Sequence, residues 1–135
     1  MSDQVIRIVA ALIRDEAGRV LLVRKRGTAA FMQPGGKRDP GEDDIAALAR
    51  EIDEELGCSI VPGSVAALGV FDAPAANEPG RRVQAAVYAL SVTGAVVPRA
   101  EIDEIAWIHP SAPHGIHLAP LTRDHVLPLA VRRTH

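Results

Sequence analysis

Several residue types are scarce in this 135-residue sequence. Cys58 is the only cysteine, so the chain cannot form an internal disulfide bond. A reducing compartment, the cytoplasm, is therefore the expected location. Aromatic residues make up only 3% of the sequence, which leaves few side chains on which a nucleobase can stack.

Long apolar runs and excess positive charge are also missing. No stretch approaches the ~20 apolar residues that a membrane-spanning helix needs, and charged residues such as Arg7 and Arg14 interrupt the N-terminal segment, which does not resemble a secretory signal. The formal net charge is −2, so we expect no general attraction to nucleic acids or to membranes. The chain is long enough to bury a core, and we expect one domain over residues 1–135.

The order of the expected elements indicates an α+β fold with a mixed sheet, because strands and helices do not alternate regularly. The segments 5–13 and 19–25 are predicted to form a hairpin around a glycine-containing turn. A helix is expected at 43–56, and a second at 119–133 with Pro128 as a kink or break. Three more strands are predicted, at 65–71, 82–92 and 102–108.

The helix expected at 43–56 carries a concentration of acids. Its apolar residues recur at helical spacing and form one stripe: Ile45, Leu48, Ala49, Ile52 and Leu56. Glu51, Glu54 and Glu55 lie together on a different face, within about 100° of one another. An ordinary solvated face is the commoner explanation of such a run. However, like charges at this spacing destabilise a helix, and Mg²⁺ or Mn²⁺ would reverse that effect by binding hard oxygen ligands.

A glycine loop precedes this helix. Gly35 and Gly36 allow the backbone to approach a bound group closely, and N–H groups near the start of a helix favour anions. Arg50 stands four residues before Glu54, so it can pair with that carboxylate and orient it. Together, these features predict a site where divalent cations and a phosphate ester meet.

The spacing of these residues resembles the Nudix box. The family pattern is Gly-x5-Glu-x7-Arg-Glu-U-x-Glu-Glu-x-Gly-U, in which U is a bulky aliphatic residue. The sequence matches this pattern over residues 36–58, and only Cys58 departs from it, at the last position. The resemblance implies a Nudix-type α/β/α sandwich with a mixed sheet, at the size of a MutT-like single domain.

The resemblance also implies roles for individual residues, with Mg²⁺ or Mn²⁺ as the cofactor. The metal-binding positions of the family correspond here to Gly36, Glu51, Glu54 and Glu55. Arg50 corresponds to the residue that orients a glutamate, and Glu51 to a general base in some members, so Arg50, Glu51 and Glu54 are the predicted catalytic residues. Glu42 corresponds to a position that more often stabilises the loop.

Residues outside the box complete the predicted site. MutT-like enzymes often take a further metal-binding carboxylate from the segment before Trp107, where Glu101 is the preferred candidate, although an ordinary exposed acid is about as common there. Trp107 itself is expected to pack in the core more often than to stack on a base. Basic residues flank the glycine loop and are suited to phosphate. The residues expected to bind substrate are Arg24, Arg26, Lys37 and Gln33.

The implied reaction is hydrolysis of a nucleoside diphosphate linked to another group, most readily a nucleoside triphosphate, oxidised or not. An ADP-ribose or ADP-sugar is the alternative substrate, because Pro74 stands sixteen residues after Cys58, as a proline does in some ADP-ribose hydrolases of the family. A module that senses a nucleotide without hydrolysing it is the alternative from another class, although degenerate boxes mark such modules and this box is intact. The expected partner is a small nucleotide, and the resemblance also suggests a homodimer.

Overall fold

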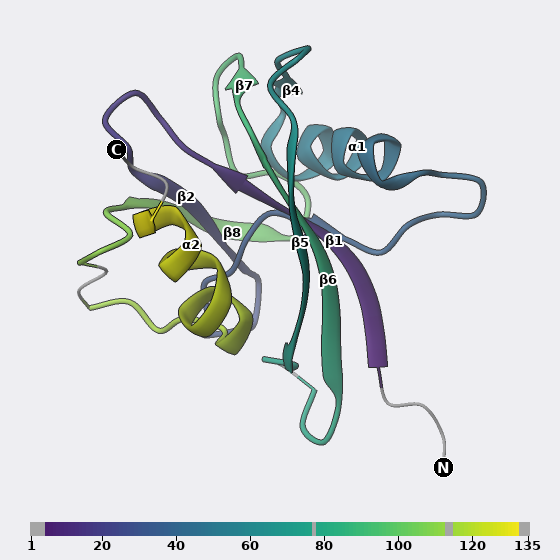
Figure 1. Cartoon of the computed structure of the whole chain (residues 1–135), viewed down its shortest axis with the longest axis vertical. Helices are drawn as coiled ribbons and strands as arrows, with labels where there is room; N and C mark the ends of the chain where they lie inside the picture. Colours follow the sequence, from purple (N-terminus) through teal and green to yellow (C-terminus); the bar gives the residue numbers. More distant parts are fainter. Residues whose placement is uncertain (1–4, 77, 113–114, 133–135) are drawn as a thin grey trace.

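The computed structural model describes residues 5–76, 78–112 and 115–132 (Figure 1). Its strands and helices follow one another along the chain as β1 (Val5–Ile13), β2 (Val20–Lys25), β3 (Gly35–Gly36), α1 (Asp44–Leu56), β4 (Ser59–Ile60), β5 (Ala66–Pro74), β6 (Arg82–Leu90), β7 (Val92–Thr93), β8 (Ile102–Ile108), η1 (Thr122–Val126) and α2 (Leu127–Arg132). None of the helices within these described ranges is long and apolar enough to cross a membrane.

The central sheet is mixed, as the sequence predicts. It has four strands in the order β3-β1-β6-β5. β1 runs parallel to β6 along its whole length, from Val5 opposite Arg82 to Ile13 opposite Leu90. β3 and β5 pair antiparallel to their neighbours. The segment after β2 and the loop after β5 both contribute residues to the cavity described below.

The predicted hairpin of β1 and β2 is wrong. The turn forms, because the Asp15 carboxylate accepts hydrogen bonds from the backbone N–H groups of Ala17 and Arg19. β2, however, pairs antiparallel with β8, while β3 and β6 occupy the two edges of β1. Only one isolated bridge, between Arg14 and Val20, joins the ends of the expected hairpin. A local turn signal determines the reversal of the chain, but the partners of both strands come from distant segments.

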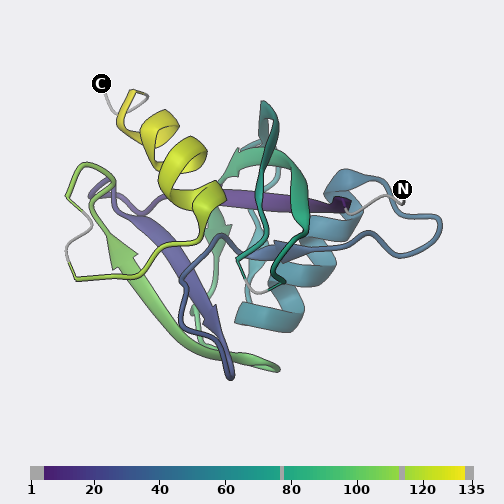
Figure 2. The ribbon, with the colours of Figure 1, turned by 90° about the horizontal axis from the view of Figure 1, so that it is seen from below.

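The two faces of the sheet are covered by different helices (Figure 2). Successive side chains of a strand point to opposite faces, and β1 is apolar on both. Val9, Ala11 and Ile13 pack with α1, whereas Ala10 and Leu12 pack with the η1–α2 segment. The α/β/α sandwich is therefore confirmed, with α1 on one side and the C-terminal helical segment on the other.

Helix α1 begins and ends near the predicted residues but is rotated about its axis relative to the expected stripe. Asp43 caps its N-terminus by accepting from the Ala46 N–H, and Gly57 ends it in the left-handed conformation. Leu48, Ile52 and Leu56 are buried as expected, but Ile45 is 38% exposed. Ala47 and Glu55 are buried in place of Ile45 and Ala49. The helix is turned toward the glycine loop, which places a carboxylate in its buried face.

The C-terminal helical segment accommodates Pro128 without a break. The N–H of Leu127 donates to the Thr122 carbonyl five residues earlier, so a π-helical turn immediately precedes the proline. Proline has no N–H to donate to the preceding turn, and wide turns of this kind are a common way to adjust a helix locally. The predicted kink is thus realised as the π-helical segment η1.

Candidate functional site

A cavity of about 390 Å³ lies where the glycine loop, β1, the β5–β6 loop and the segment before η1 meet. One part of its lining carries charged groups and the glycine loop, and we call it the charged end: Lys25, Gly36, Lys37, Asp39, Glu51 and Glu101. Another part is aliphatic, and we call it the apolar end: Ile6, Ile8, Met32, Val83, Ala119 and Leu121. A nucleotide has the same division between its phosphates and its base.

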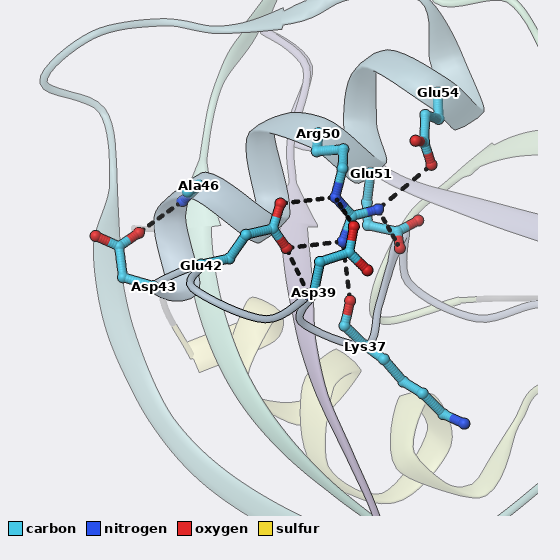
Figure 3. A network of polar contacts seen from close by, with 8 residues as sticks. All are labelled: Lys37, Asp39, Glu42, Asp43, Ala46, Arg50, Glu51 and Glu54. Carbon is cyan, nitrogen blue, oxygen red and sulfur yellow. Dashed lines mark hydrogen bonds and ion pairs between the residues drawn. The ribbon is translucent and has the colours of Figure 1, made fainter.

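Arg50 connects α1 to the loop that precedes it (Figure 3). Its guanidinium binds both carboxylate oxygens of Glu42, with Nε 2.7 Å from Oε2 and Nη2 2.9 Å from Oε1. It also lies 3.2 Å from Asp39 and donates to the Lys37 carbonyl at 3.0 Å. The hydrogen bonds from Arg50 and from the Asp39 N–H lower the pKa of Glu42 to about 2. Glu42 is therefore ionised at every physiological pH and fixes the loop.

The contacts of Arg50 with the other acids of α1 are longer. Nη1 lies 3.2 Å from Glu51 and 3.4 Å from Glu54. The sequence predicts that Arg50 orients Glu54, whereas in the structure it binds Glu42 most closely. The Glu54 side chain is 54% exposed and outside the lining of the cavity, so it lies at the outer edge of the charged end.

Glu55 is the buried carboxylate of the site, with 3% exposure. The backbone N–H of Gly35 donates to its Oε1 at 3.2 Å. Burial, and then the nearby charge of Glu51, raise the pKa of Glu55 to about 8 against the opposing effect of Lys25. Burial likewise raises the pKa of Glu51, although Arg50 acts in the other direction. Two adjacent carboxylates in a poorly solvated position favour a bound cation or a proton.

Close packing requires glycine at position 35, and a side chain at position 36 would displace the Glu51 carboxylate. A Cβ atom on Gly36 would lie 2.5 Å from Oε2 of Glu51, and one on Gly35 would clash with the Val9 carbonyl. Gly35 also has φ 148°, a conformation that side chains disfavour. Glycine at both positions therefore allows the loop to lie against α1 and β1, with the Glu51 carboxylate beside the backbone of Gly36.

The residues at the charged end fit a hard divalent cation. Among the described residues, no group of three or more His, Cys, Asp or Glu side chains is arranged to hold a metal ion. Mg²⁺ does not require such a cage, because it usually binds one or two carboxylates together with substrate phosphates and water. Glu51 and Glu101 line the cavity, and buried Glu55 lies close enough to both for their charges to raise its pKa.

The structure separates the residues that the sequence predicts for substrate binding. Lys37 and Gln33 line the cavity, as does Pro74. Arg24 and Arg26 are not in its lining. Arg26 donates to the Ala100 carbonyl at 2.9 Å.

On β2, the sequence predicted Arg24 to bind substrate, but its neighbour Lys25 is the residue that lines the cavity. Arg24 lies 3.0 Å from both Asp103 and Glu104 near the start of β8. Lys25 instead lines the cavity and lowers the pKa of both Glu51 and Glu55. Adjacent residues of a strand face opposite ways, so only one of these two side chains can face the site. The alternation of side chains along the strand could therefore have shown, from sequence alone, that Arg24 and Lys25 do not both face the site.

Gln33 and Trp107 have clear environments. Gln33 is 6% exposed, and its Oε1 accepts a hydrogen bond from the Thr122 hydroxyl at 2.9 Å. Trp107 is partly buried and packs against the core on the α1 side of the sheet, as the sequence predicts. The apolar end was not predicted, because all its side chains except that of Met32 come from β1, β6 and the segment before η1, which no local motif connects.

Comparison with known proteins agrees with the resemblance to the Nudix family that the sequence shows. A family model described as NUDIX domain matches residues 5–129. A Haemophilus influenzae protein named 8-oxo-dGTP diphosphatase is 39% identical over 61 residues, covering 42% of this chain and 45% of that protein. A Bacillus subtilis protein named putative 8-oxo-dGTP diphosphatase is 29% identical over 101 residues, covering 73% and 63% respectively. The matches thus span less than two thirds of each curated relative.

A solved structure is similar over almost the whole fold. The crystal structure of a MutT protein from Methanosarcina mazei Go1 superimposes with a TM-score of 0.77 at 28% identity, covering 98% of this chain and 96% of that one.

Proposed function

The chain belongs to the Nudix family, and from that premise we propose that it is a pyrophosphohydrolase that cleaves a nucleoside triphosphate, normal or oxidised. The observation that carries the proposal is the position of Glu51 in the lining of the cavity, next to Gly36, with buried Glu55 behind it on the Gly35 N–H. The names of the two curated relatives support an oxidised nucleoside triphosphate as the substrate.

We propose Mg²⁺ or Mn²⁺ as the cofactor, since Nudix hydrolases generally use divalent metal ions. The residues proposed to hold it are Glu51, Glu54, Glu55, the Gly36 carbonyl and Glu101. When bound, such an ion lowers the pKa of water and offsets the charge that develops on phosphate oxygens. Glu54 is exposed in the structure, so its participation requires only a side-chain rotation from the outer edge of the charged end.

Glu51 is the proposed general base. A water molecule attacks a phosphorus atom of the anhydride between the α- and β-phosphates, a new P–O bond forms, and the bridging P–O bond of that anhydride breaks, which releases nucleoside monophosphate and pyrophosphate. Glu51 accepts the proton of that water at a carboxylate oxygen. Its pKa is raised by burial, which strengthens it as a base, and the Arg50 guanidinium 3.2 Å away favours its ionised form.

Basic residues at the charged end bind the phosphates in this proposal. Lys25 and Lys37 line the cavity from β2 and from the glycine loop. Arg50 acts indirectly, because it binds the Lys37 carbonyl and Glu42 and so holds the loop in place. Arg50 is thus a positioning residue for the loop and for Glu51.

An ADP-ribose or ADP-sugar remains the second candidate substrate. The observation that favours it is the position of Pro74, which lines the same cavity. From the family resemblance, we also propose that the protein is located in the cytoplasm and forms a homodimer. Fractionation of cells that express the chain, and sedimentation of the purified protein, would test these two points.

A substrate panel tests the proposed function. Purified protein would be incubated with Mg²⁺ or Mn²⁺ and with nucleoside triphosphates, 8-oxo-dGTP, ADP-ribose and an ADP-sugar, and the products would be separated. We expect nucleoside monophosphate and pyrophosphate from a triphosphate. Binding without turnover of any compound, with either metal, would instead identify a nucleotide-sensing module.

A further inference from the structure

Among the described residues that line the cavity, Gln33 is the one with a side-chain amide, and it is buried. Thr122 is fully buried, and its hydroxyl donates to the Gln33 Oε1 at 2.9 Å. The contact joins the segment before the glycine loop to the first turn of η1, 89 residues later in the chain. It occurs among aliphatic neighbours that line the same cavity, including Ile8 and Leu121.

The nitrogen of this amide is unsatisfied. Nε2 of Gln33 is buried, and within the described residues it has no hydrogen-bond partner. A buried donor without an acceptor is unfavourable, and native structures rarely contain one without a reason. Because Gln33 also lines the cavity, a bound ligand is the natural source of the missing acceptor.

In the structure, the Thr122 hydroxyl occupies the carbonyl of the Gln33 amide and leaves the amide nitrogen available. A glutamine side chain can present either its carbonyl or its NH₂ group, depending on its orientation. With the carbonyl accepting from Thr122, only the NH₂ group is left to contact a ligand. Gln33 therefore offers a donor rather than an acceptor.

Gln33 lies in the same cavity as Gly36 and Glu51, close enough for one nucleotide to reach all three. Gln33 stands three residues before Gly36 at the charged end, a separation of at most about 11 Å along the chain. A nucleotide with its phosphates near Gly36 and Glu51 can thus place its base among the aliphatic side chains around Gln33.

We propose that Gln33, oriented by Thr122, is a specificity-determining residue that donates a hydrogen bond to the O6 carbonyl of a purine base. The site then favours guanine and hypoxanthine over adenine, whose amino group presents a second donor to Nε2. This inference rests on the proposed function, since it takes a nucleotide as the ligand of the cavity.

Binding of nucleoside monophosphates without metal tests the inference separately from catalysis. The four ligands are dGMP, dIMP, dAMP and the 2-aminopurine deoxynucleotide, measured by isothermal titration calorimetry. Only dGMP and dIMP carry O6, and we expect them to bind about tenfold more tightly than the other two. Equal affinity for all four, or no binding of any, would overturn the inference.

Three variants identify the residues responsible. Gln33→Leu removes the hydrogen-bond donor, so dGMP and dIMP should no longer bind more tightly than dAMP and the 2-aminopurine deoxynucleotide. Thr122→Val keeps the shape of the side chain but lets the amide rotate, so the preference should narrow while dAMP binds more tightly. Thr122→Ser keeps the hydroxyl and should retain the preference. If Gln33→Leu does not fold, the comparison of Thr122→Val with Thr122→Ser decides.

The two proposals fail in different ways. An unchanged preference in both Gln33→Leu and Thr122→Val, or an equal loss of affinity for all four ligands, would contradict the role of Gln33. Turnover of a triphosphate without any base preference would overturn this inference alone. The expected base preference without turnover would support it and contradict the proposed hydrolysis.

Discussion

The charged and apolar ends of the cavity are built in different ways. Most of the charged end comes from one continuous stretch, the glycine loop and helix α1, with Lys25 and Glu101 added from β2 and the start of β8. Apart from Met32, which directly precedes the glycine loop, the apolar end is assembled from β1, β6 and the segment before η1, which are far apart in sequence. The difference suggests that the reaction depends on a local motif, whereas the choice of substrate depends on how distant elements pack.

Glu51→Gln should have the largest effect. The amide keeps the size of the side chain but cannot accept the proton, so turnover should fall by about 10²–10⁴-fold. Asp53→Asn is the matched control, because Asp53 lies on the same helix with an exposed side chain. The measurement is the initial rate of pyrophosphate release at saturating substrate. A drop of similar size in Asp53→Asn would show that the helix needs its net charge rather than this particular carboxylate.

Glu55 should make the metal-free protein less stable as the pH rises. Its pKa is about 8 in the folded chain against an ordinary value of 4.5. Between these values the folded state holds a proton that the unfolded state has lost, so the free energy of unfolding decreases with pH. The contribution is fully present below pH ~4.5 and is lost by pH ~8, a change on the order of 4 kcal/mol. Urea unfolding at several pH values in the presence of a chelator would measure it.

Glu55→Gln is the test of that assignment. The neutral amide has no proton to lose, so most of the pH dependence between pH 5 and 8 should disappear and the variant should be the more stable protein at pH 8. Because Glu42 has a lowered pKa of about 2, it should contribute little in this range. An unchanged slope in Glu55→Gln would place the titrating group elsewhere.

Arg50→Lys should loosen the loop before α1, which Arg50 holds in place at the charged end. Lysine keeps the charge but cannot bind both oxygens of Glu42 and the Lys37 carbonyl at once. We expect kcat to fall about tenfold or more, with a loss of about 1–2 kcal/mol in the free energy of unfolding. Steady-state kinetics and thermal unfolding, measured on the same preparation, would compare the fall in kcat with the loss of stability. A loss of stability with normal kcat would mean that the loop is not needed in this position for catalysis.

Lys25→Gln should raise KM for the triphosphate roughly tenfold, because it removes a positive charge from the lining of the cavity. Arg24→Gln is the matched control on the same strand and should have a smaller effect, since Arg24 already binds Asp103 and Glu104. A larger rise in KM for Arg24→Gln would restore the prediction made from sequence that Arg24 contacts the substrate.

What the sequence predicted well depends on short-range spacing. The ends of α1, the extents of β1 and β8 and the grouping of Gly36 with Glu51 all follow from periodicity, capping or local motif. These patterns act within one element or between an element and the adjacent loop. The burial of Glu55 is an exception, because the rotation of α1 is set by its packing on the sheet rather than by the hydrophobic stripe alone.

What could not be predicted depends on pairing between distant segments. The turn at Asp15 forms, yet β2 joins β8 rather than β1. Local turn chemistry says nothing about which strand fills each edge of a sheet. The contact between Gln33 and Thr122 spans 89 residues and has no sequence motif. The same reason explains why sequence analysis identified Gly36, Lys37, Glu51 and Glu101 at the charged end but did not identify the apolar end.

A crystal structure with Mn²⁺ and a non-hydrolysable dGTP analogue tests the account most directly. The anomalous signal of Mn²⁺ would locate the cation, and the density would locate the base in the same experiment. The account predicts Mn²⁺ beside Glu51 and Glu55, with the triphosphate near Gly36 and the base among the side chains of the apolar end. Mn²⁺ bound away from these carboxylates, or a nucleotide bound outside the cavity, would contradict it.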